Sequence, residues 1–336
     1  MRLQSTFIGL AFLATAFSSC SEDDTFKVEE PIGAVINVDM GGDAQDHQVY
    51  INLNDSVTTR VANNSWDLAL SNGSEFVAKI NYAAGAEAAT TGINDWSELT
   101  SEAIEAAVAM LPGGYQTMEG HVDNPSEFIT DTAIPAISST ASDNEIFVIK
   151  QNSSATSWAL VQVLQENGGY KVITASTDAF DTQEMYTVEK DAMYNFSYVS
   201  FESGAVSVEP AKGDWDIAFT QTTARQEGVA VAYKDYIIQN QGVKVALIDE
   251  LETSVDFASF TEVDLETLNP EFSSSRTTIG SSWRVFDFST YTYTITPNQF
   301  YLIEDLDGNV VKMRITAMLN TEGERGYQQF EYTELQ

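Results

Sequence analysis

A tryptophan-aspartate strand pattern occurs twice in this chain of 336 residues, and this recurrence restricts the fold more than any other feature. Residues 66–70 read WDLAL, and residues 215–219 read WDIAF, 149 positions later. A tyrosine-containing strand pattern precedes each copy, and further strand-like segments match at slightly larger offsets. Several matches in the same order indicate two copies of one unit. Such a unit is too long for a solenoid repeat, so we expect two tandem domains with separate cores.

Strand signals dominate the chain after the acidic tether. Segments rich in β-branched and aromatic residues alternate with turn residues, which is typical of strands; they include residues 49–53, 76–80, 146–149, 158–164 and 170–174. Helix signals are fewer. A helix is expected over residues 95–111, because Asp95 can cap it and a Pro-Gly-Gly run follows it. A second, shorter helix is expected over residues 263–268.

The predicted fold is therefore all-β, with two tandem, mostly antiparallel domains and one or two short helices. The first domain is expected over residues 33–185 and the second over residues 186–336. The Trp-Asp strand should be central in each domain, with its tryptophan facing inward. Asp67 and Asp216 should accept hydrogen bonds from nearby backbone donors or from a turn.

The first twenty residues predict an export signal that ends at the only cysteine. An apolar run over residues 7–17 is too short to span a membrane but fits the core of a secretory signal over residues 1–19. The sequence FSSC at residues 17–20 resembles a bacterial lipobox, which predicts acylation of Cys20. An acidic tether follows over residues 20–32. Its SEDD run resembles a signal that sends lipoproteins to the cell surface, or it only keeps the tether solvated.

The charge balance excludes two classes of partner. The chain has 50 acidic and 16 basic residues, so its formal net charge is −34. Such a chain would repel nucleic-acid phosphates and anionic lipid surfaces, which are bound by clustered Lys and Arg. Membrane contact is therefore expected through the N-terminal lipid alone. Acylation of Cys20 would leave no free thiol, which excludes disulfides, thiol catalysis and cysteine-based metal sites.

Catalytic motifs are absent from the sequence, so we expect a protein that is not an enzyme. There is no Gly-x-Ser-x-Gly elbow, no glycine-rich phosphate loop and no histidine pair on a helix. A hydrolase that uses two carboxylates is the weaker third hypothesis, because acidic residues are abundant. The run DLDGN at residues 305–309 predicts a hairpin turn and not a calcium loop, although structural Ca²⁺ elsewhere stays open.

The second half resembles the HmuY haem-binding lipoproteins of Bacteroidetes over about residues 194–335. The resemblance is carried, in order, by YVSFESG at 198–204, GDWDIAF at 213–219, Trp283, FYLI at 300–303, DGN at 307–309, KMRITA at 312–317, Gly326 and FEY at 330–332. The first half looks like a diverged copy, mainly through residues 66–70. The resemblance implies an all-β fold, outer-membrane and surface attachment, and capture of haem for delivery to a TonB-dependent receptor in iron acquisition.

Family members hold the haem iron with axial His or Met side chains from facing loops. The second half of this chain has no histidine, and the segment after Trp283 reads RVFDF, so the family's ligands have no counterpart there. In the first half, Met118 and His121 follow the predicted helix and are the axial-ligand candidates. An exposed loop histidine is the alternative interpretation of His121.

Arg276 and Arg284 are the candidates for pairing with the two haem propionates, because the chain has few other basic residues. The alternative function keeps the fold but changes the ligand. In that case the protein is a surface lipoprotein that binds another compound or a partner protein and has lost haem ligation.

Overall fold

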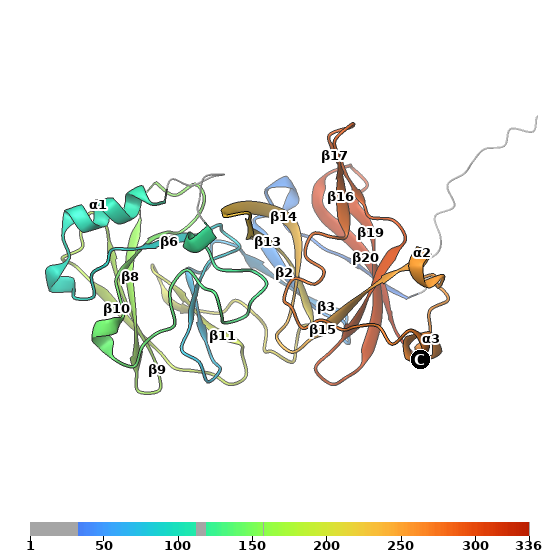
Figure 1. Ribbon diagram of the computed structural model, residues 1–336, viewed down its shortest axis with the longest axis horizontal. Coiled ribbons are helices and arrows are strands. Elements are labelled where there is room, and N and C mark those ends of the chain that lie inside the picture. Colours follow the sequence, from blue (N-terminus) through green and yellow to red (C-terminus); the bar gives the residue numbers. More distant parts are fainter. Residues whose placement is uncertain (1–32, 112–118, 157, 336) are drawn as a thin grey trace, which may run out of the picture. The chain divides into compact units, whose positions relative to one another are not determined.

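Twenty strands and three α-helices form the part of the chain that the computed structural model describes, residues 33–111, 119–156 and 158–335 (Figure 1). Every ladder between named strands in these residues is antiparallel. The all-β, antiparallel fold class predicted from the sequence is thereby confirmed.

Two sheets enclose the first hydrophobic core, which contains side chains from both. The larger sheet has the order β10 (Glu184–Val188), β9 (Gly169–Ser176), β8 (Ala159–Glu166), β7 (Phe147–Lys150) and β6 (Glu87–Thr90). The smaller sheet has the order β12 (Gly204–Val206), β11 (Phe196–Ser200), β4 (Leu68–Ser71) and β5 (Ala78–Ile80).

Two further sheets enclose the second core in the same way. The larger one has the order β1 (Ala34–Asn37), β20 (Arg325–Glu334), β19 (Val310–Leu319), β18 (Gln299–Glu304) and β15 (Lys244–Asp249). The smaller one has the order β14 (Val229–Gln239), β13 (Ile217–Gln226), β2 (His47–Asn52) and β3 (Val57–Ala62). A separate hairpin consists of β16 (Arg284–Asp287) and β17 (Thr292–Ile295).

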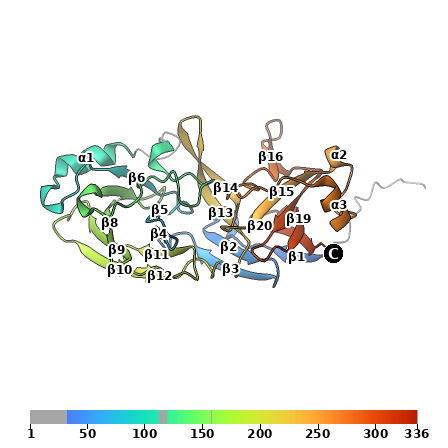
Figure 2. The same cartoon turned by 60° about the horizontal axis from the view of Figure 1, so that its bottom comes forward.

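The two halves of the sequence exchange strands. Strand β1 pairs with β20, β2 pairs with β13, and β4 pairs with β11, so each core contains strands from both halves (Figure 2). The domain boundary expected between residues 185 and 186 stays a prediction. The strand pairing shows in addition that each half of the sequence needs strands from the other half to complete its sheets.

The two Trp-Asp segments have matching surroundings. Trp66 packs edge-on against Tyr198, and Trp215 packs edge-on against Tyr50, with ring centroids 5.0 Å apart in both pairs. Both strands are central in their sheets, as the sequence predicted. These equivalent contacts favour the interpretation as two copies of one unit, which stays a prediction.

The two aspartates of these segments accept hydrogen bonds from backbone donors, as expected. The Asp67 carboxylate accepts from the backbone N–H of Phe201 at 2.7 Å. The Asp216 carboxylate accepts from that of Leu53 at 2.8 Å. Each bond joins the two halves of the sequence, so the aspartates stabilise the exchanged pairing and not only a local turn.

The helix expected over residues 95–111 is shorter than predicted. Asp95 caps a single 3₁₀ turn at Trp96–Glu98, and the backbone is extended at Leu99. The α-helix α1 begins only after a second cap, where the Thr100 side chain accepts from the Ala103 N–H, and covers Ser101–Ala109. Two capping residues close together therefore divide the predicted helix.

The other helices are short. The helix expected over residues 263–268 is α3 (Glu262–Leu268), which begins with a capping box between Thr261 and Asp264. A one-turn helix α2 (Glu250–Thr253) was not anticipated. No helix in the described ranges is both long enough and apolar enough to cross a membrane.

Two details of the last hairpin bear on candidate ligands. Met313 and Met318 should face opposite sides of a regular strand, because they are five residues apart. Both are buried in the second core, since the register shift between Ile315 and Ala317 in β19 reverses the alternation before Met318. The Asp305 carboxylate accepts from the backbone of Asp307 and Asn309, so this segment is the expected hairpin turn between β18 and β19.

Candidate functional site

His121 ends a 3₁₀ turn, Glu119–His121, and is half-buried. Its Nδ1 lies 2.9 Å from the carbonyl oxygen of Ala88. A carbonyl oxygen only accepts, so Nδ1 must carry the proton and Nε2 keeps its lone pair in the neutral ring. This is the arrangement that leaves a histidine able to bind a metal through Nε2. The geometry is therefore compatible with the ligand candidate, which stays a prediction.

The turn that contains His121 lies against the tip of the β13–β14 hairpin. The Glu119 N–H donates to the carbonyl oxygen of Gly228 at 3.3 Å, and Arg225 of the same hairpin pairs with Asp131 at 2.7 Å. Strands β13 and β14 thus bring part of the second half of the sequence to His121. The second ligand candidate, Met118, lies outside the described residues.

Arg276 is buried inside a cluster of aromatic side chains, with 5% of its surface exposed. One Nη2–H donates to the Tyr82 hydroxyl at 3.1 Å, and the guanidinium lies 4.7 Å from the centroid of that ring. Its Nε has no hydrogen-bond partner. Burial of this kind points the charge at the protein interior, so a propionate could pair with Arg276 only after the cluster opened.

Arg284 begins strand β16 and is 8% exposed. Its Nε lies 3.7 Å from a carboxylate oxygen of the fully buried Asp235, and its Nη2–H donates to the carbonyl oxygen of Lys234. The Arg325 Nε–H donates to the same Asp235 oxygen at 2.7 Å. Two guanidinium groups therefore share one carboxylate, which leaves a surplus positive charge at this position.

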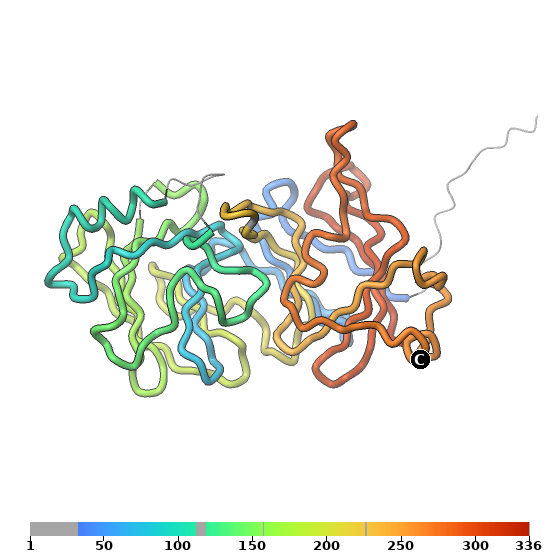
Figure 3. Tube along the Cα trace, viewed as in Figure 1, coloured from blue at the N-terminus to red at the C-terminus, as the bar shows by residue number. Residues whose placement is uncertain are grey.

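An exposed aromatic hairpin extends from that charged base. This hairpin, residues 284–295, projects away from the neighbouring strands (Figures 1 and 3). The Phe286 ring contacts those of Phe288, Tyr291 and Tyr293, with centroids 5.0, 6.2 and 4.9 Å away. Phe288 and Tyr291 are each 80% exposed. Such a group of exposed aromatic rings is typical of a binding surface.

The base and the rings of the aromatic hairpin are in direct contact. The Tyr293 ring lies 4.3 Å from the Arg284 guanidinium and 5.0 Å from that of Arg325. At the tip, the Asp287 carboxylate accepts from the N–H and hydroxyl of Ser289. These bonds stabilise the turn of the hairpin, whose Tyr293 ring contacts both guanidiniums.

In this segment the sequence had singled out Arg284 as a propionate partner, but its aromatic rings were not anticipated. The signal was present, because aromatic residues at 286, 288, 291 and 293 alternate on both sides of a polar turn.

The structure does not bring all the predicted site residues together at one place. Arg276 contacts Tyr82 and lies in the aromatic cluster, Arg284 lies at the hairpin base, and His121 contacts Ala88. Within the described ranges, no group of three or more His, Cys, Asp or Glu residues is arranged to hold a metal ion.

Residues 192–332 match a family described as HmuY protein. This match confirms the resemblance seen in the second half, whereas the first half as a diverged copy stays a prediction. Comparison with curated proteins gives no match.

Several solved structures are similar at low identity. The apo HmuY analogue of Tannerella forsythia is 10% identical, with 92% of this chain and 99% of that chain covered and a TM-score of 0.32. A protein of Bacteroides vulgatus described as HmuY-like and haem-binding is 19% identical, with 46% and 80% covered and a TM-score of 0.21. A protein of Bacteroides fragilis described as a lipoprotein is 17% identical, with 52% and 88% covered and a TM-score of 0.22.

Proposed function

Because residues 192–332 carry the HmuY family pattern, we propose that this protein is a surface-anchored binding lipoprotein that captures haem for iron acquisition. The aromatic hairpin, which lies inside the matched residues, is the observation that supports this proposal most directly. We propose no catalytic activity, because HmuY-like proteins act as binding proteins.

The chemistry of the aromatic hairpin suits a flat ligand that carries negative charge. A porphyrin presents a broad apolar face, and stacking on exposed aromatic rings removes both surfaces from water. Its two propionates are anionic, and the guanidiniums of Arg284 and Arg325 outnumber the carboxylate of Asp235. This local surplus matters in a chain whose formal net charge is −34. Of the two guanidiniums, that of Arg325 is the accessible one, because 27% of its side chain is exposed against 4% for Arg284. Arg325 is therefore the proposed contact for an anion at the hairpin base.

The iron would need an axial ligand, for which His, Met and Tyr are all suitable. His121 keeps a free Nε2 by virtue of its bond to Ala88, and Met118 remains its proposed partner. Tyr291 adds a phenol that is 80% exposed on the aromatic hairpin. Ring contact is thus assigned to the aromatic hairpin, on which Tyr291 lies, and His121 and Met118 stay the iron-ligand candidates predicted from the sequence.

A haemin titration followed by the Soret band tests the proposal. We expect the wild-type chain to shift the band at micromolar haemin, and Phe288→Ala with Tyr291→Ala to weaken binding about tenfold or more, as expected for lost aromatic contact area. Leu251→Ala is the matched control, because Leu251 is also an exposed apolar residue but lies on α2. If only His121→Ala lost the Soret shift, this result would identify His121 as the iron ligand. It would not support contact between the hairpin rings and the porphyrin. No Soret shift with wild type would refute haem capture.

The second candidate function is recognition of a partner protein or another compound by the same hairpin. Its support is the 80% exposure of Phe288 and Tyr291, which a partner could cover. A TonB-dependent receptor is the proposed partner for haem transfer. Copurification of a receptor with the wild-type chain, but not with the double hairpin variant, would support this function if the haemin titration were negative.

Membrane attachment through Cys20 completes the proposal. Replacement of Cys20 by alanine should release the protein from the outer-membrane fraction into the soluble fraction, since no lipid could then be attached. External protease digestion of intact cells distinguishes a surface lipoprotein from one that faces the periplasm.

A further inference from the structure

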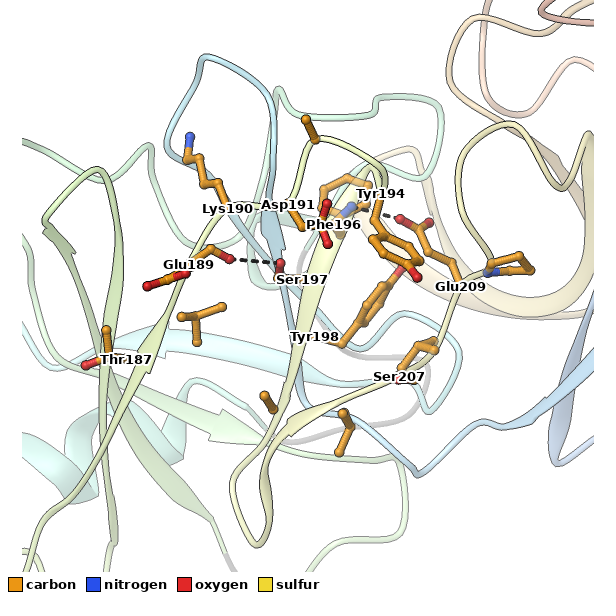
Figure 4. Close-up of a pocket in the computed structure, with 16 residues that line it drawn as sticks. Thr187, Glu189, Lys190, Asp191, Tyr194, Phe196, Ser197, Tyr198, Ser207 and Glu209 are labelled. Atoms are coloured by element: carbon orange, nitrogen blue, oxygen red, sulfur yellow. Dashed lines mark hydrogen bonds between the residues drawn. The ribbon is translucent and has the colours of Figure 1, made fainter.

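A cleft with a volume of about 570 Å³ lies between the segment after β10 and the strands β11 and β12 (Figure 4). Its volume is in the usual range for small-molecule sites. The lining includes the rings of Tyr194, Phe196 and Tyr198 and the carboxylate of Glu209. The residues of the aromatic hairpin do not line this cleft, so it is separate from the proposed haem surface.

Glu209 is the unusual side chain of this cleft, because it is a carboxylate with only 7% of its surface exposed. One carboxylate oxygen accepts from the Phe196 N–H at 2.8 Å. Tyr198 also lies within hydrogen-bonding reach, and Arg276 lowers the pKa of Glu209 from a longer distance. No ion pair joins Glu209 to a cationic side chain within the described ranges.

A buried carboxylate without an ion-pair partner is costly, because Arg276 acts only from a longer distance and replaces the lost hydration in part. Burial accordingly raises the pKa of Glu209 to about 7. The cost falls if a ligand brings a positive charge into the cleft. Figure 4 shows Tyr194, Tyr198 and Glu209 at the same end of the cleft.

The remaining charges of the lining favour the same kind of ligand. Glu189 and Asp191 add two exposed carboxylates, and Lys190 is the one cation among the lining residues. The Lys190 ammonium donates to the carbonyl oxygens of Gly73 and Glu75 at 2.7 and 3.1 Å, so it is already bound elsewhere. The carboxylates of the lining would repel an anionic ligand. A metal ion is also disfavoured, because the described residues contain no group of three or more His, Cys, Asp or Glu side chains arranged to hold one.

We propose that this cleft binds a small organic cation, an ammonium group bearing a short side chain, with Glu209 as its counter-ion and the half-buried ring of Tyr194 beside it. Aromatic rings attract ammonium groups through their electron-rich faces, and quaternary ammonium ligands are commonly held in this way. The site does not depend on haem binding, so each proposal can fail without the other.

Choline chloride is the probe, and 3,3-dimethylbutan-1-ol is its uncharged control of the same shape. Binding to the purified chain is measured by calorimetry and by saturation-transfer NMR. We expect choline to bind at least about tenfold more tightly than the alcohol, because the charge interacts with the desolvated carboxylate and rings. Equal affinities would show an apolar cleft and would overturn the proposal, as would absence of choline binding at tens of millimolar.

Two variants locate the site. Glu209→Gln keeps an acceptor for the Phe196 N–H and should weaken choline about tenfold, whereas the exposed Glu202→Gln should not change it. Tyr194→Ala should weaken choline and Tyr194→Phe should not, because phenylalanine keeps the ring face. Circular dichroism confirms that each variant is folded. If both Glu209→Gln and Tyr194→Ala bound choline like wild type, the proposal would be wrong.

Discussion

Replacing Glu209 by glutamine should change how the stability of the protein depends on pH. Glutamine is nearly the same size and has no charge, so it resembles the protonated form of Glu209. Below pH 4.5 the two proteins should therefore have similar free energies of unfolding. Above neutral pH the variant should be the more stable, because wild type then carries a buried carboxylate.

The sign follows from the two pKa values of Glu209. In the unfolded chain the carboxyl has its ordinary pKa of 4.5, and burial raises the pKa of Glu209 to about 7 in the folded protein. Between these values the folded state binds more protons than the unfolded state. Stability from this group is therefore complete below pH 4.5 and is lost as the pH rises to about 7.

The magnitude follows from the same two values. One pKa unit corresponds to about 1.4 kcal/mol, so the shift of Glu209 amounts to about 3 kcal/mol over this range. For a chain that unfolds cooperatively, this is a large fraction of a typical stability of about 5–15 kcal/mol. The difference between variant and wild type should grow by about that amount between pH 4.5 and pH 8.

The groups that face Glu209 do not reverse the sign. Tyr198 and Tyr50 are protonated across this range, because burial holds the pKa of each well above 10. Arg276 stays charged and moderates the shift, and the Tyr82 hydroxyl accepts a hydrogen bond from it. These residues are present in both proteins, so their own contributions cancel in the comparison.

Urea unfolding followed by tryptophan fluorescence at pH 4.5, 6, 7 and 8 provides the measurement. Glu202→Gln is the control, because Glu202 is exposed and should behave like wild type at every pH. A constant difference between Glu209→Gln and wild type from pH 4.5 to pH 8 would refute the argument, since it would mean that Glu209 ionises in the folded protein as it does in the unfolded chain.

Three further changes test other parts of the fold by urea or thermal unfolding. Asp67→Ala leaves the buried Phe201 N–H without an acceptor and should cost about 1–3 kcal/mol, with most of the loss recovered in Asp67→Asn. Gly326→Ala should lower the melting temperature, because Gly326 has φ +87° and an added Cβ would lie 2.1 Å from the Gly42 carbonyl oxygen; an unchanged melting temperature would contradict this contact. Burial lowers the pKa of Lys79 to about 7, so wild-type stability should rise between pH 7 and 9 more than that of Lys79→Met, and parallel curves would exclude the shift.

Local patterns in the sequence predicted the two central Trp-Asp strands and the position of helix α3. The alternation around Trp66 and Trp215 predicted two central strands, and both are central in the structure. The helix expected over residues 263–268 likewise corresponds to α3. The division of the first predicted helix was missed, because Asp95 and Thr100 are both good caps and pattern alone does not select between them.

The candidate site was less accessible to sequence reasoning. The pattern of iron-ligand residue types pointed to His121, and the RVFDF segment pointed only to Arg284 as a propionate partner. Its rings became a candidate surface only because the β16–β17 hairpin leaves Phe288 and Tyr291 exposed. The burial of Glu209 could not be predicted from the sequence, because nothing in the sequence distinguishes it from the other acidic residues among the 50.

The sequence by itself determined the strand-rich fold class, the HmuY resemblance of the second half and the Trp-Asp segments, because these depend on side-chain periodicity and order along the chain. Only the tertiary structure decided that β2 pairs with β13 and that β4 pairs with β11. The reason is physical. A strand offers the same row of N–H and C=O groups to any partner, so its choice depends on which side chains can be buried together. The burial of Glu209 and the exposure of the aromatic hairpin follow from that choice.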